Sequence, residues 1–195
     1  MRIRFSMVVS VLALASPSAY GGDLGEVPGF QAESVTYREG EDPRSRLQVY
    51  VAPQGKRLEG IPPRGITLIE PAGQSQRWMV DPDAQVFAVD TSAAKGAELG
   101  GLLSHTPCKG FPESKKMGAE TLQGRTVQKW QCQHPEFGTV TQWFAPELGT
   151  VVRDRTSNGE VQELRNIRVG KQPANLFRFR KKNDFEKVPV IQLFR

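Results

Sequence analysis

The chain has 195 residues with a formal net charge of +5, and 38% of its residues are hydrophobic. This length suits one domain with an ordinary hydrophobic core, and the small net charge argues against a nucleic-acid-binding protein. Fourteen prolines and nineteen glycines are scattered without a low-complexity run, which indicates frequent tight turns between short strands.

The N-terminus has the order of a secretory signal peptide. Arg2 and Arg4 carry its positive charge, an apolar run extends from Phe5 to Ala15, and small, turn-forming residues follow up to Gly21. The apolar run is shorter than the roughly 20 residues that a transmembrane helix needs, so we predict cleavage after Gly21 rather than a membrane anchor. No cysteine lies near the junction, so we expect no lipid attachment there.

The predicted signal peptide determines which compartment and which mature chain we expect. Removing residues 1–21 would leave 174 residues with a net charge of +3. Residues 22–29 contain glycine and proline but little apolar content, which is typical of a flexible lead-in. We therefore expect a periplasmic protein whose folded domain occupies residues 30–195.

Alternation of apolar and polar residues predicts nine or ten strands and one or two short helices, hence a mainly β fold built on a single antiparallel sheet. The strongest hairpin signal is Asn158-Gly159, because this pair readily adopts the positive φ angles of a two-residue turn. Between Thr91 and Leu103 the rhythm breaks, and Ser92 is placed to cap a short helix. The predicted strands are residues 32–38, 46–51, 65–70, 76–81, 85–90, 116–123, 126–133, 138–144, 150–156 and 160–169.

Cys108 and Cys132 are the only cysteines. In an exported chain an even number of cysteines favours a disulfide, here a structural bridge that closes a loop of roughly 25 residues. Two alternatives stay open: unpaired thiols, and a Cys₂His₂ zinc site completed by His105 and His134, which lie close in sequence to the two cysteines.

Catalytic and cofactor motifs are missing from the sequence. There is no Gly-x-Ser-x-Gly elbow, no phosphate-binding loop and no dinucleotide-binding glycine pattern. Neighbouring carboxylates such as Asp81 and Asp83 fall in predicted turns, where aspartate caps the backbone. We therefore expect a noncatalytic protein without a cofactor.

Aromatic side chains fall within or beside the predicted strands. Alternation should place several of them on one face, either as part of the core alone or as a core that leaves an apolar ligand cavity. The candidate apolar ligand face consists of Tyr50, Trp78, Phe87, Trp130, Trp143 and Phe144.

The tail at residues 178–182 interleaves Arg178, Arg180, Lys181 and Lys182 with Phe179. Such a cluster could contact anionic lipid headgroups. The alternative is a solvated terminal segment whose long basic side chains flank a buried phenylalanine.

The second half of the chain, from about Lys116 to Phe179, resembles exported bacterial domains of the LolA-like superfamily. The resemblance rests on three stretches: Glu120-Thr121-x-x-Gly124-Arg125-x-x-x-Lys129-Trp130, then Trp143-Phe144-x-Pro146-Glu147-x-Gly149-x-Val151-x-Arg153, and then Glu163-Leu164-x-Asn166-Ile167-x-x-Gly170-x-Gln172-Pro173-x-x-Leu176-Phe177.

The resemblance implies an incomplete, strongly curved antiparallel half-barrel that encloses an apolar cavity. We accordingly expect a noncatalytic periplasmic protein that binds a lipid, an acyl chain or an apolar peptide on the concave face of its sheet. The alternative is a protein-interaction module in envelope biogenesis or stress signalling, which would use the same sheet as a docking surface.

Overall fold

The computed structural model describes residues 28–91, 101–134, 138–181 and 184–194. The predicted signal peptide, most of the predicted lead-in and most of the predicted helix around Ser92 lie outside these ranges. So do the predicted turn at Pro135-Glu136 and the basic residue Lys182.

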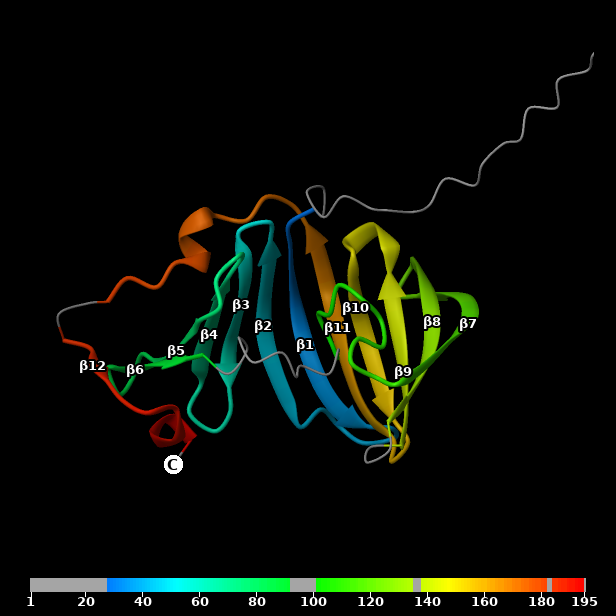
Figure 1. Ribbon diagram of the computed structural model, residues 1–195, viewed down its shortest axis with the longest axis horizontal. Helices are drawn as coiled ribbons and strands as arrows, with labels where there is room; N and C mark the ends of the chain where they lie inside the picture. The colour runs from blue at the N-terminus through cyan, green and yellow to red at the C-terminus, as the bar shows by residue number, and fades with distance from the viewer. Residues whose placement is uncertain (1–27, 92–100, 135–137, 182–183, 195) are drawn as a thin grey trace, which may run out of the picture.

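One sheet contains all the strands that the described residues form (Figure 1). The strands are β1 (Phe30–Arg38), β2 (Ser45–Ala52), β3 (Gly55–Ile61), β4 (Ile66–Pro71), β5 (Arg77–Asp81), β6 (Val86–Asp90), β7 (Glu113–Leu122), β8 (Arg125–His134), β9 (Gly138–Ala145), β10 (Thr150–Thr156), β11 (Glu160–Val169) and β12 (Glu186–Lys187).

The spatial order is β12-β6-β5-β4-β3-β2-β1-β11-β10-β9-β8-β7. Two meanders, β1 to β6 and β7 to β11, therefore join where β1 pairs with β11 in the middle of the sheet. All pairings are antiparallel except that of the two-residue β12 with β6. The sheet is curved and open, with β7 and β12 at its edges (Figure 1), and the predicted single curved antiparallel sheet is confirmed.

Each of the ten predicted strands is present, together with two that alternation does not predict, β3 and β12. β3 reads Gly-Lys-Arg-Leu-Glu-Gly-Ile, where charges and two glycines hide the alternation. The helical elements among the described residues are 3₁₀ turns, namely η3 (Pro146–Leu148), η4 (Ala174–Phe177) and η5 (Val190–Phe194). No helix in the described ranges is long and apolar enough to cross a membrane.

The largest core cluster lies over the middle of the sheet, where the two meanders meet. It joins side chains from β1, β2, β8, β9, β10, β11 and η3 with Leu103 from the chain between β6 and β7. Among its members, Phe30, Val49, Leu148 and Leu164 are at most 1% exposed. A second cluster forms where η5 packs on β4 and β6, around Ile66, Ala88 and Leu193.

Gly55 opens β3 and allows its backbone to lie directly against β4. Its φ is +147°, and a Cβ atom there would lie 2.3 Å from the carbonyl oxygen of Glu70. Gly73, in the turn after β4, also has a positive φ, but a Cβ atom there would meet nothing within 4 Å.

We predict that Gly55→Ala lowers the free energy of unfolding by about 3 kcal/mol or more, because both backbone strain and a backbone clash oppose it. Gly73→Ala, which adds strain without a clash, should cost about 1 kcal/mol. Urea unfolding of the two variants measures the difference. Equal losses would show that β3 and β4 are not packed as described.

Candidate functional site: a groove beside the disulfide-anchored segment

Residues 101–111, which we call the anchored segment, cross one face of the sheet (Figure 1). Leu103 donates its backbone N–H to the carbonyl oxygen of Val151 over 2.9 Å, and Val151 donates to the carbonyl oxygen of Ser104 over 2.8 Å. These two bonds join the segment to the start of β10. We call the face that the segment covers the inner face.

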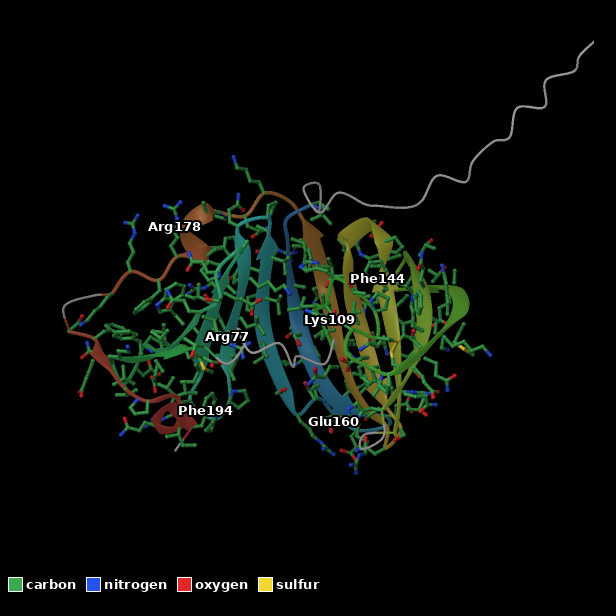
Figure 2. The ribbon with its side chains drawn as sticks, viewed as in Figure 1. Arg77, Lys109, Phe144, Glu160, Arg178 and Phe194 are labelled. Carbon is green, nitrogen blue, oxygen red and sulfur yellow. A yellow bond between two sulfur atoms is a disulfide. The ribbon has the colours of Figure 1, made fainter. Side chains whose placement is uncertain are left out.

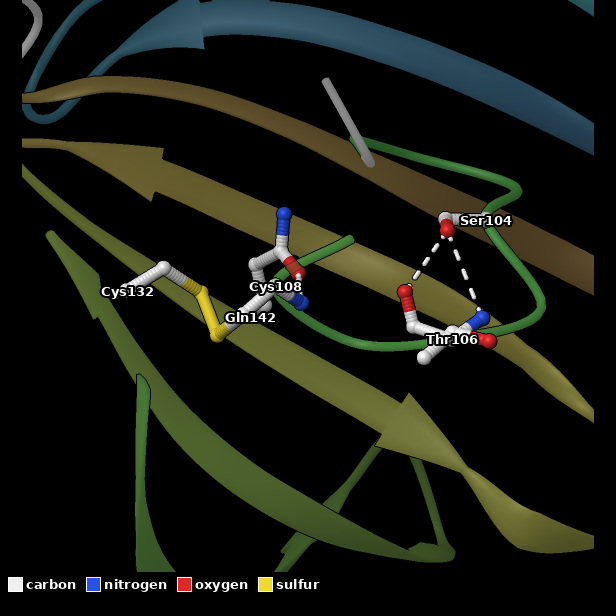
Figure 3. The surroundings of a disulfide bond; sticks show 5 residues. All are labelled: Ser104, Thr106, Cys108, Cys132 and Gln142. Carbon is white, nitrogen blue, oxygen red and sulfur yellow. Dashed lines mark hydrogen bonds between the residues drawn. A yellow bond between two sulfur atoms is a disulfide. The ribbon is translucent and has the colours of Figure 1, made fainter. Parts of the chain in front are cut away.

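The disulfide fixes the other end of the segment. Cys108 is bonded to Cys132 on β8, and both residues are buried. Beside the bond, the fully buried side-chain oxygen of Gln142 on β9 accepts the backbone N–H of Cys108 over 2.7 Å, and Figure 3 shows this arrangement. The predicted disulfide is confirmed, and because it uses both sulfur atoms, the Cys₂His₂ zinc alternative is excluded.

Each histidine has a local contact. Nδ1 of His105 lies 2.9 Å from the carbonyl oxygen of Gly149, and the ring of His134 packs edge-on against Phe111 at 5.9 Å between centroids. Within the described ranges, no three His, Cys, Asp or Glu side chains gather closely enough to hold a metal ion.

A partly buried carboxylate holds the start of the segment. Oδ2 of Asp154 on β10 accepts the backbone N–H of Leu102 over 2.9 Å. Burial raises the pKa of Asp154 to about 6, although hydrogen bonds from the backbone of Leu102 and Gln162 favour the charged form. Gly101 lets the chain approach this closely, because a Cβ atom there would lie 3.2 Å from Oδ2.

A lysine on the opposite meander also holds the segment. Nζ of Lys56 on β3 donates to the carbonyl oxygen of Leu103 over 2.9 Å. Leu103 therefore touches both β10 and β3, which are four positions apart in the sheet and would be separated by about 19 Å in a flat sheet. We infer that the sheet curves around the anchored segment.

A groove of about 630 Å³ lies between the anchored segment and strands β2 to β5. Its apolar lining includes Val51, Leu58 and Leu68 from three successive strands and Leu102 and Leu103 from the segment. Leu58 and Leu68 are only partly buried, so they present apolar surface to the groove. This volume lies within the roughly 300–1,000 Å³ of small-molecule sites.

Charged side chains surround the apolar lining. Lys56, Arg77 and Lys109 supply three positive charges, and Glu70 supplies one negative charge. Arg77 comes from β5 and Lys109 from the anchored segment (Figure 2). Nη1 of Arg77 lies 3.8 Å from Glu70, and its Nε is paired with Asp90 at 2.8 Å. An apolar lining with a surplus of cations suits an apolar chain that carries an anionic group.

The candidate aromatic face is not one face. Trp130 is paired across the strands with Gln142, whose neighbour in the chain is Trp143, so the two tryptophans point to opposite faces. Phe144 shares the inner face with Trp130. The strand pairings place four side chains on the opposite face, which we call the outer face: Trp143, Tyr50, Trp78 and Phe87.

None of the six aromatic residues lines the groove. Trp143 is 4% exposed and lies between Lys129 and Arg153, whose cationic groups are 5.3 and 4.8 Å from its ring centroid. Its Nε1 donates to Glu120 over 2.5 Å. Side chains of the chain itself, Lys129, Arg153 and Glu120, therefore surround the Trp143 ring.

The other aromatic residues also have neighbours within the chain. Phe179 covers Phe87 and Trp78 at centroid distances of 4.9 and 6.5 Å. Trp130 packs against the disulfide cluster, and its buried Nε1 has no hydrogen-bond partner among the described residues. Tyr50 is partly buried and lies opposite Arg57 in register.

The residues that shape the groove carry little signal in the sequence. Lys56 and Leu58 lie on β3, which alternation does not predict. Asp154 is one of several charged residues on β10, and nothing in the sequence distinguishes it from the others. The sequence does single out two kinds of residue near the groove. Leu102 is an apolar residue of the predicted helix, and the two cysteines predict the disulfide. The register that brings these residues together is set by pairings over long sequence distances.

The chain matches no protein-family model and no curated protein. Its fold is that of solved structures. An uncharacterized conserved protein from Thermus thermophilus matches with a TM-score of 0.56 and 12% identity, over 84% of this chain and 93% of that protein.

Two further solved structures match the chain. PNGF-II matches with a TM-score of 0.53 and 12% identity over 85% of this chain, which corresponds to 32% of PNGF-II. A LolA superfamily protein from Nitrosomonas europaea matches with a TM-score of 0.37 and 11% identity, over 79% of this chain and 91% of that protein. At these identities the matches concern the fold.

The partly buried Asp154 makes stability depend on pH. Its folded-state pKa of about 6 lies above the usual 3.8, so the folded chain retains a proton that the unfolded chain releases, and this group's contribution to stability falls as pH rises from about 4 to 6. Asp154→Asn stays neutral and keeps an acceptor for Leu102. We predict that the variant exceeds the wild type in unfolding free energy by on the order of 2 to 3 kcal/mol at pH 7.5, and by much less at pH 4.

Urea unfolding at the two pH values tests this. A difference between variant and wild type that does not change with pH would contradict it.

Proposed function

We propose that the protein is a noncatalytic periplasmic binding protein, and that its groove takes an acyl chain with an anionic headgroup. The single observation that carries the proposal is the groove itself, in which partly exposed Leu58 and Leu68 line a space of about 630 Å³ beside Lys56 and Lys109. The buried disulfide agrees with an exported chain.

Each half of the ligand has a counterpart in the groove. The hydrocarbon chain would lie along the leucine surfaces of β3 and β4, where each buried methylene contributes about 0.8 kcal/mol. The headgroup would lie near Nζ of Lys109, which is exposed on the anchored segment. Lys56 is engaged with the carbonyl oxygen of Leu103 and would add its positive charge from the wall of the groove.

Filling the groove should block binding. We predict that Leu68→Trp weakens palmitate binding at least tenfold, about 1.4 kcal/mol, because the indole takes the space of the hydrocarbon chain. The control is Thr67→Trp, which places the same ring on the opposite face of β4 and should leave the affinity within about twofold. Isothermal titration calorimetry measures both.

A separate variant tests the proposed contact between the headgroup and Lys109. Lys109→Gln should weaken palmitate binding severalfold and leave the binding of uncharged hexadecanol unchanged, because only palmitate carries a negative charge at pH 7.5. The proposal fails if palmitate does not bind saturably, or if the two tryptophan variants bind alike. Retention of a stoichiometric protein partner with no lipid binding would overturn it in favour of the protein-interaction module.

A further inference from the structure

We propose that residues 168–181, the basic segment, form a docking surface for a membrane that contains anionic lipids. The segment carries five cationic residues and no acidic residue, and all five cations are exposed: Arg168, Lys171, Arg178, Arg180 and Lys181. It continues from the end of β11 and passes along the ends of the strands towards β6 (Figure 1).

These cations differ from most arginines of the sheet, although Arg38 at the end of β1 is also exposed and has no ion pair among the described residues. Arg46, Arg155 and Arg165 each pair with a carboxylate at 3.0 Å or less, and so do Arg44, Arg57, Arg77 and Arg125. Within the described ranges none of the five cations of the basic segment has an ion pair, and Lys181 differs from the other four because its Nζ lies 5.8 Å from the ring centroid of Phe87. Their charge is therefore available to an external anionic surface.

The basic segment is held in a fixed conformation. Phe177 is 1% exposed, and Phe179 packs on Phe87. Arg178 is extended, at φ −125° and ψ 123°. Alternation along this extended stretch therefore turns the two phenylalanines towards the sheet and Arg178 and Arg180 towards solvent, and Figure 2 shows Arg178 at the margin of the molecule.

A second contact ties the basic segment to the sheet. Nη1 of Arg57 on the outer face donates to the carbonyl oxygen of Leu176 over 3.2 Å. Because the segment is already ordered, docking would cost little conformational entropy. A spread of fixed, unpaired cations suits a planar anionic surface, which attracts charge without requiring directional bonds.

The apolar residue Val169 lies within the same stretch and is 51% exposed. Because Val169 follows Arg168 on β11, its side chain points to the opposite face of the strand, and it is not counted in the docking surface. The occupant we assign is the headgroup layer of an anionic bilayer. This proposal concerns a different surface from the groove and does not require the groove to bind an acyl chain.

Cosedimentation with vesicles tests the assignment. The purified protein should bind vesicles of 30% phosphatidylglycerol in phosphatidylcholine at 50 mM NaCl, and should not bind phosphatidylcholine alone. Binding should be lost at 500 mM NaCl, because salt screens the attraction between charges. The triple variant Arg178→Gln, Arg180→Gln, Lys181→Gln should bind on the order of 100-fold more weakly, at about fivefold per charge.

The matched control removes three exposed cations elsewhere, through Arg38→Gln, Lys115→Gln and Lys116→Gln, and should weaken binding less than fivefold. Equal losses in the two triple variants, or equal binding to both kinds of vesicle, would overturn the proposal. So would one-to-one binding of polyglutamate together with no vesicle binding. The groove variant Leu68→Trp should bind vesicles normally, which separates this result from the test of the groove.

Discussion

The Cys108–Cys132 disulfide and the segment it anchors are the constraint on which the rest of the structure depends. A sheet of this size has apolar side chains on its inner face, and the described residues contain no α-helix to cover them. Leu103 of the anchored segment joins the largest core cluster, whose other members come from β1, β2, β8, β9, β10, β11 and η3. The segment is fixed by a covalent bond to β8 and by hydrogen bonds to β10 and β3. Because it covers only part of the inner face, the neighbouring leucines are left to line a groove.

The outer face is closed by different means. Glu163 is 5% exposed and lies between Arg153 and Arg165 at 3.6 and 2.5 Å, and the guanidinium of Arg165 also covers the ring of Tyr37 at 5.1 Å. Long paired side chains thus cover the strands at the middle of the sheet, while Phe179 covers those near β6. The chain's own side chains occupy this face, whereas the groove of about 630 Å³ lies on the inner face.

The sequence is informative wherever a local pattern decides the structure. Ten strands follow from alternation, the turn at Asn158-Gly159 from its residue types, and the disulfide from the expected compartment. Alternation does not predict β3 because charged residues stand where a regular pattern would have apolar ones. Two of these residues hold other parts of the chain: Lys56 donates to the anchored segment and Arg57 to the basic segment. The assignment of the aromatic residues to one face is wrong for two reasons: it overlooks alternation within β9, and it groups residues of different strands, whose faces are related by register rather than by alternation. Trp143 and Phe144 are adjacent in one strand and therefore point to opposite faces.

In the proposed complex an acyl ligand lies between the anchored segment and the leucines of β3 and β4. Photo-crosslinking with a diazirine-bearing palmitate, followed by peptide mapping, tests it most directly. We expect labels on peptides that contain Leu58, Leu68 or Leu102, and competition by unlabelled palmitate. Labels confined to the peptides of Trp78 and Phe87 would contradict it, because the ligand would then lie on the outer face.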